Sequence, residues 1–179
     1  MANLIDLPWE RFTLDTDPQD RISPNFRFYE LTRSETADRR NIDNTFKALE
    51  PLRSAVYLSR KILQPLRDQF GRFSPNSVYR SQQLELALKH KRKDWVSKSQ
   101  HTLGCACDIE IPGMPTIDLA GWVSNNLEYD QIICECYSAA KGPNSGWVHV
   151  SVVPPGTGKN RARLLSNVMD SNPGKHVPN

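Results

Sequence analysis

The clearest periodic pattern in the chain lies over residues 44–69, where apolar positions recur at steps of three and four, apart from one gap of six. This spacing gathers them on one face and predicts the main core helix, which Gly71 ends. Pro51 and Pro65 fall inside it. Because an internal proline loses a hydrogen bond and clashes with the preceding turn, we expect each at a first-turn position or at a kink. The apolar residues of this face are Phe46, Leu49, Leu52, Val56, Ile62, Leu63, Leu66 and Phe70.

Shorter elements are predicted on both sides of this helix. Before it we expect an extended piece over 26–31 and a brief helix over 35–41, for which Ser34, Thr32 or Thr36 could be the N-cap. After it we expect a strand over 73–80 and a short helix over 82–89.

The second half of the chain predicts a sheet. Residues 104–111 alternate, with Cys105, Cys107, Ile109 and Ile111 on one face and Ala106, Asp108 and Glu110 on the other. A helix follows, because Leu119, Trp122, Val123 and Leu127 have helical spacing. Strands at 130–137 and 147–153 flank a loop rich in Gly, Pro and Asn and predict an antiparallel hairpin. We expect one or two helical turns in 160–169 and a mobile end over 171–179.

These elements combine several helices with an antiparallel hairpin. With 179 residues the chain has the size of one domain. The pattern divides it into an N-terminal arm at 1–24, a domain at 25–153 and a partly mobile C-terminal extension at 154–179. No internal repeat is visible.

Composition narrows the class of protein. Hydrophobic residues make up 38% and charged residues 24%, which is a globular composition. No apolar run is long enough to span a bilayer, and residues 1–10 lack the basic and apolar segments of a secretory leader. We therefore expect no membrane partner and synthesis in the cytoplasm. The net charge of +3 is too small an excess to indicate a nucleic-acid partner.

Four cysteines form two pairs, Cys105 with Cys107 and Cys134 with Cys136. Within a strand each pair points to one face. Reduced buried thiols, a disulfide, or a zinc ion bound by four thiolates are all compatible with this pattern, although structural zinc sites usually space their cysteines by two to four residues. A reducing cytosol favours the thiols.

Two histidines lie beside carboxylates in strand-like segments. His101 precedes Asp108 by seven residues, and His149 lies within the strand at 147–153. A catalytic zinc takes three protein ligands, commonly histidines with a carboxylate, and keeps a fourth position open. Taken alone, this spacing is also compatible with an ordinary buried histidine.

The surrounding residues are more specific. Residues 99–108 match Ser-x-His-x-x-Gly-x-Ala-x-Asp, and residues 147–149 match a later Trp-x-His element. Together they resemble the zinc D-alanyl-D-alanine carboxypeptidases and L-alanyl-D-glutamate endopeptidases that act on peptidoglycan, and most closely the small phage and prophage members. The likeness covers about residues 25–153. It extends to Glu30-Leu31-Thr32, Ser34, Thr36-Ala37, Ile42-Asp43-Asn44, Leu66-Arg67-Asp68, Phe70-Gly71, Ser77-x-Tyr79-Arg80-Ser81 and residues 130–133.

The resemblance implies an α+β fold shared with the hedgehog signalling domain, in which an antiparallel sheet carries the metal and packs against helices. It also implies one Zn²⁺ per chain, held by His101, Asp108 and His149. Many members place a catalytic acid three residues before the last histidine, but that position is Gly146 here. We therefore predict that Glu135 shuttles the proton, because its strand parity, opposite to Cys134 and Cys136, can face it toward His149. Asp130 is the alternative.

The resemblance also implies a substrate-binding role for Arg80, whose planar guanidinium pairs with a carboxylate. Trp147 and Ser99 are further substrate-binding candidates, although Ser99 could equally form a turn. The sequence departs from the peptidase motifs at two places near the expected substrate-binding groove. Val78 stands where glycine is usual, and a Lys/Arg-rich stretch over 89–98 replaces a Gly-Gly segment. A charge run of this kind is usually a solvated loop, but near the site it could attract an anionic wall.

The expected function is thus a zinc peptidase that cuts peptide stems of peptidoglycan as a monomer. It would act after the membrane is permeabilised or as part of a virion. A binding module without catalysis and a phage structural component on the same fold are the alternatives.

Overall fold

The computed structural model describes residues 2–168, and the predicted mobile end at 171–179 lies outside them. Four short irregular helices occur in this part: η1 (Trp9–Arg11), η2 (Phe28–Leu31), the π-helical turn η3 (Ser59–Leu63) and η4 (Ala139–Lys141). The α-helices are α1 (Glu35–Arg40), α2 (Leu49–Leu58), α3 (Gln64–Phe70), α4 (Gln82–Lys89) and α5 (Thr116–Asn126). The strands are β1 (Ala106–Ile109), β2 (Gln131–Tyr137), β3 (Trp147–Ser151) and β4 (Arg163–Val168).

The four strands form one sheet in the order β1-β3-β2-β4. β3 is antiparallel to both β1 and β2, which confirms the predicted hairpin. β4 runs parallel to β2, so the sheet is mixed, and the prediction of a purely antiparallel sheet is wrong.

The prediction of helical turns in 160–169 is also wrong, because residues 163–168 of this segment form β4. Its sequence does not alternate, and its pairing comes from the free edge of β2. The backbone N–H of Arg163 donates to the carbonyl of Asp130 at 3.0 Å, which starts the ladder.

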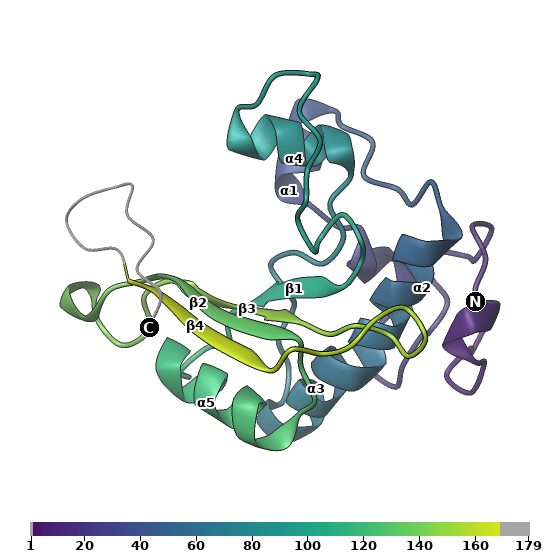
Figure 1. Cartoon of the computed structure of the whole chain (residues 1–179). Helices are drawn as coiled ribbons and strands as arrows, with labels where there is room; N and C mark the ends of the chain where they lie inside the picture. Colours follow the sequence, from purple (N-terminus) through teal and green to yellow (C-terminus); the bar gives the residue numbers. More distant parts are fainter. Residues whose placement is uncertain (1, 169–179) are drawn as a thin grey trace.

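Figure 1 shows α5 and α3 beneath the sheet, with α4 and the loop that follows it above. The apolar face of the sheet, including Ile109, Ile132 and Val148, is buried together with Leu119 and Val123 of α5. This burial leaves the alternate residues of β1 and β3, among them Asp108 and His149, on the opposite face.

The main helix begins at Leu49, later than predicted, and continues through η3 to Phe70. Pro51 is its third residue, in the first turn, where a backbone N–H would have no acceptor within the helix. Pro65 follows the π-helical turn, whose wider hydrogen bonding accommodates the missing N–H. Both prolines therefore have the positions that proline chemistry requires.

The N-terminal arm packs on this helix. Phe12 and Ile22 are buried in the same core. The guanidinium of Arg60 in η3 donates to the backbone carbonyls of Ile22, Leu7 and Leu4 at 2.7, 2.7 and 2.8 Å. One side chain thus satisfies three carbonyls of the arm, which holds it against the helix.

The remaining short elements are partly as predicted. The helix over 35–41 is confirmed, and its N-cap is Ser34, whose hydroxyl accepts from the N–H of Ala37. The prediction of an extended piece over 26–31 is wrong. Phe28–Leu31 is a 3₁₀ helix, in which the Glu30 carboxylate accepts from the N–H of Arg27. The strand over 73–80 is reduced to a single bridge between Ser77 and Asp108.

All four cysteines are free thiols, and Cys105, Cys107 and Cys134 are buried. Burial raises the pKa of all four thiols, which opposes the thiolate form that zinc ligation requires. The reduced-thiol interpretation is the one that the structure supports.

Candidate metal centre

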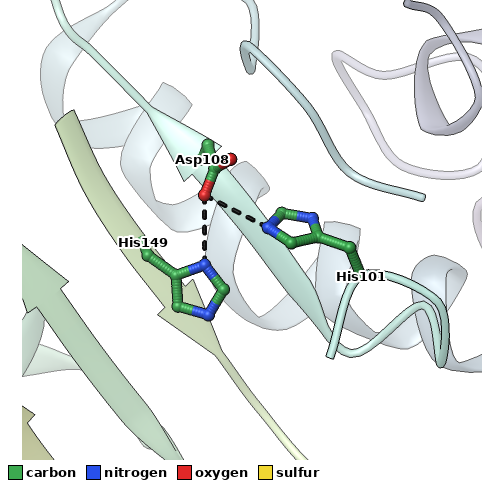
Figure 2. A group of neighbouring side chains, drawn as sticks. All are labelled: His101, Asp108 and His149. Carbon is green, nitrogen blue, oxygen red and sulfur yellow. Dashed lines mark hydrogen bonds and ion pairs between the residues drawn. The ribbon is translucent and has the colours of Figure 1, made fainter. Parts of the chain in front are cut away.

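Three side chains meet on the polar face of the sheet (Figure 2). The Asp108 Oδ1 atom lies 3.2 Å from His101 Nε2 and 3.1 Å from His149 Nδ1. All three residues are buried, with 1%, 3% and 6% of their surface exposed for His101, Asp108 and His149. The structure thus brings together the three metal ligands that the sequence predicted.

Strand register places two of these residues. Asp108 of β1 and His149 of β3 are direct cross-strand partners, so their side chains share a face. His101 comes from the turn before β1. Gly104 in that turn has a φ of +68°, and a Cβ there would lie 2.0 Å from the Pro51 carbonyl oxygen. Only glycine lets this turn approach the main helix so closely.

The protonation of both imidazoles follows from their outer hydrogen bonds. His101 Nδ1 lies 2.6 Å from the Val78 carbonyl, which can only accept, so this nitrogen carries the proton. His149 Nε2 lies 3.3 Å from Gln100 Oε1 and donates in the same way. In the neutral imidazoles, the inner nitrogens therefore present lone pairs to Asp108.

In that form two lone pairs and a carboxylate converge without a donor between them, and either a bound cation or a proton on each inner nitrogen satisfies them. Ligand atoms of these residues all lie within 4.8 Å of one another. A tetrahedral ion with bonds of ~2.1 Å would separate its ligands by ~3.4 Å, close to the 3.2 and 3.1 Å from Asp108 Oδ1 to His101 and His149. Within residues 2–168, no fourth His, Cys, Asp or Glu joins the cluster.

The electrostatics of Asp108 keep it ionised. Burial alone would raise the pKa of this carboxyl, but hydrogen bonds from His101 and His149, which need a proton on the inner nitrogens, and the charge of Arg80 lower it well below its usual value. A permanently ionised aspartate suits a metal ligand, because only the carboxylate form coordinates.

Arg80, the predicted substrate residue, lies beside the metal cluster. Its Nη2 pairs with Asp108 Oδ2, its Nε donates to Ser77 Oγ at 2.8 Å, and its Nη1 lies 3.4 Å from Glu85 Oε1. Glu85 is a fully buried carboxylate of α4 that sequence reasoning missed. Its pair with Arg80 helps to fix the guanidinium at the rim of the site.

Glu135 lies on the same face as His149. It pairs with Trp147 across the β2–β3 ladder, two residues along from the pair of Ile133 with His149. This makes Glu135 a diagonal neighbour of His149, for which Cα atoms are typically ~7–8 Å apart. The register therefore places Glu135 on the face of the sheet that its strand parity predicted.

Gly146 cannot carry the acid that the related motif places there. Its φ is +71°, and a Cβ would lie 2.1 Å from the Glu135 carbonyl oxygen and 2.6 Å from the carbonyl carbon of Cys136. The tight hairpin therefore excludes any side chain at this position, and Glu135 is the carboxylate that the hairpin itself supplies.

Asp130, the alternative proton shuttle, is engaged elsewhere. Its oxygens accept from the Arg161 guanidinium at 2.8 and 2.6 Å and from Gln100 Nε2 at 2.7 Å. These hydrogen bonds from Arg161 lower the pKa of Asp130, although partial burial opposes the shift. A carboxylate held in this way has little basicity for proton transfer, which favours Glu135.

The other two substrate candidates have local contacts. Ser99 Oγ accepts from the N–H of His101 at 3.4 Å, so Ser99 shapes the turn that presents this ligand. Trp147 is half-buried, and within residues 2–168 its indole N–H is buried without an acceptor. Sequence reasoning missed Val78, Gln100 and Arg161, because no residue type marks a backbone acceptor or a relay through side chains.

The basic stretch lies above the sheet, in α4 and the loop after it (Figure 1). Lys89 Nζ and Lys91 Nζ lie 5.7 and 6.0 Å from the centre of the Trp95 ring. Lys91, Arg92 and Lys93 are exposed. The loop therefore presents positive charge to solvent on the same side of the sheet as the cluster.

A scan against protein-family profiles finds no family that matches this chain, and a search of curated proteins finds no matching relative. None of the helices within residues 2–168 is long and apolar enough to cross a bilayer.

Proposed function

We propose that the protein is a zinc-dependent peptidase that hydrolyses the peptide stems of bacterial peptidoglycan. The observation that carries the proposal is the convergence of two buried imidazoles and one buried carboxylate, whose ligand atoms all lie within 4.8 Å of one another. Such a set of two histidines and one aspartate, with no fourth protein ligand among residues 2–168, is typical of catalytic rather than structural zinc sites.

The donor set favours zinc over harder cations. Imidazole nitrogens suit zinc and other late transition metals, whereas magnesium and calcium prefer oxygen ligands. When bound, zinc supplies Lewis acidity, which polarises a carbonyl and lowers the pKa of water.

The residues around the cluster would transfer the proton and bind the substrate. Glu135 would take the proton from the attacking water and return it to the leaving amine, because it lies on the site face beside the last ligand. Arg80 would bind a substrate carboxylate, since its guanidinium is held at the rim beside Asp108. Trp147, the cross-strand partner of Glu135, would contact the substrate beside it.

The substrate class rests on the resemblance of residues 99–108 and 147–149 to the peptidoglycan peptidases and on the hedgehog-like fold which that resemblance implies. A terminal D-alanine carboxylate or the side carboxyl of D-glutamate would each fit an arginine clamp, so both carboxypeptidase and endopeptidase activity are within the proposal. The chain would act as a monomer on the wall, after permeabilisation or from a virion.

Gly146 favours one alternative, a wall-binding module that holds zinc without turnover, because the usual acid is absent there. Purified protein separates the two. The peptidase predicts one zinc per chain and release of peptide products from defined muropeptides, detected by mass spectrometry. Loss of both in His101→Ala would link the metal to the activity, and bound zinc with no product would favour the binding module.

Glu135→Gln tests the proton shuttle. The variant should keep its zinc and lose 10²–10⁴-fold in turnover, since general acid–base catalysis contributes about that much. Glu110→Gln, an exposed carboxylate at the end of β1, is the matched control and should keep normal turnover. Near-normal turnover of Glu135→Gln would remove Glu135 from the mechanism.

A further inference from the structure

We propose that the segment after β3 completes the metal site, through a relay in which Arg161 holds Asp130, Asp130 holds Gln100, and Gln100 holds the ligand His149. These three are positioning residues. The inference rests on the metal site of the proposed function and assigns a role to a segment that the sequence places outside the domain.

The outer end of the relay is a two-point ion pair. Arg161 Nε donates to Asp130 Oδ1 at 2.8 Å, and Arg161 Nη2 donates to Oδ2 at 2.6 Å. The backbone N–H of Arg161 adds a third bond to Oδ1 at 3.0 Å. Asp130 is 1% exposed and its own N–H donates to the Ser151 carbonyl at 2.7 Å. The carboxylate is therefore fixed in both position and direction.

The middle of the relay fixes the orientation of an amide. An ionised carboxylate can only accept, so Gln100 must turn its NH₂ group toward Asp130 Oδ2, at 2.7 Å. Its carbonyl oxygen then faces His149 Nε2 at 3.3 Å and requires a proton on that nitrogen. Asp130 thus favours the Nε2-protonated form of His149 without touching it, against Asp108 Oδ1, which faces Nδ1 at 3.1 Å.

That tautomer decides whether His149 can bind a metal. With the proton on Nε2, Nδ1 directs its lone pair at the point where Asp108 and His101 converge. If the Gln100 amide were free to turn over, its NH₂ would favour a lone pair on Nε2 and a proton on Nδ1, which blocks coordination.

The two histidines differ in what holds them. His101 Nδ1 donates to the Val78 carbonyl, a backbone group that no substitution removes. His149 depends on side chains, and the last of them lies just before β4, whose parallel pairing with β2 fixes the segment. The C-terminal segment is therefore predicted to control the affinity of the site for metal.

The test compares zinc affinities, measured by competition with a chromophoric chelator, in the full-length chain. Gln100→Leu should weaken zinc binding by 10–100-fold, the usual effect of losing an outer partner of a ligating histidine. Arg161→Met should weaken it by a smaller factor, and Arg161→Lys, which keeps the charge but loses the two-point contact, should lie between Arg161→Met and wild type. Lys159→Met is the control, because Lys159 is exposed on the same segment.

A second readout separates positioning from loss of folding. In metal-free protein, ¹⁵N spectra of His149 should show the proton on Nε2 in wild type and a shift toward Nδ1 in Gln100→Leu, while circular dichroism stays unchanged. A zinc affinity of Gln100→Leu equal to that of wild type, or of Arg161→Met equal to that of Lys159→Met, would overturn the relay. Wild-type protein that binds zinc but cleaves no muropeptide would overturn the peptidase alone, whereas failure to bind zinc would overturn both.

Discussion

A side chain at Gly146 should cost more stability than one at another left-handed glycine. Gly146 has φ +71° and Gly113 has φ +80°, so alanine at either position pays about 1–2 kcal/mol for the left-handed backbone. The two sites differ in the free space around an added Cβ atom. Nothing lies within 4 Å of a Cβ at Gly113, whereas at Gly146 the Cβ would meet backbone atoms of residues 135–137 at 2.1 to 2.7 Å. Backbone atoms cannot rotate away, so the hairpin itself must shift.

The extra cost of Gly146→Ala can be placed at about 1–3 kcal/mol, the usual range for forcing atoms into a packed site. For a chain of this size each kcal/mol lowers the melting temperature by about 2–4 °C, so Gly146→Ala should melt about 2–12 °C below Gly113→Ala. Thermal unfolding followed by circular dichroism measures the difference. The shift should also displace Glu135, whose carbonyl is the nearest atom, and reduce turnover in the variant that remains folded at assay temperature.

Equal melting temperatures for the two alanine variants would refute this reasoning. So would a Gly146→Glu variant that folds like wild type, because the hairpin would then accept the acid that we argue it excludes. In that case the absence of the acid would need another explanation, and the case for Glu135 would lose its structural support.

Two further predictions concern charge. Replacing Lys91, Arg92 and Lys93 by alanine should weaken binding to sacculi at low salt. The difference from wild type should shrink as salt rises, because the Debye length falls from ~10 Å at 0.1 M to ~3 Å at 1 M. Unchanged pelleting with sacculi at low salt would contradict a role of the loop in binding the wall. Glu85 provides a pH test: burial alone would raise its pKa, but Lys89, Ser97 and Arg80 lower it below 4.5. Its ionisation therefore stabilises the fold above about pH 4.5 and ceases to do so as the pH falls through the lowered value. The gap in unfolding free energy between wild type and Glu85→Gln should close over that acid range, and a gap independent of pH would contradict the assignment.

The fold was predictable where local pattern and packing agree. The main helix and α5 follow from apolar spacing, since each buries one face against the core, and the β2–β3 hairpin follows from the turn residues between its strands. The prediction failed for β4, because a parallel edge strand needs a free partner strand rather than a pattern of its own. It also failed for residues 26–31, where a side chain of Glu30 closes a short helical turn.

The candidate metal ligands were predicted from the resemblance of residues 99–108 and 147–149 to zinc peptidases. Strand parity agreed, because it places Asp108 and His149 opposite the apolar faces of their strands. What completes the site could not be predicted. The Val78 carbonyl, the Gln100 amide and the Arg161 guanidinium act through direction and distance, and these are set by segments that meet only in the folded chain. Sequence determined which atoms can bind a metal, and tertiary structure decided which lone pairs point at it, since hydrogen bonding from remote residues selects the tautomer.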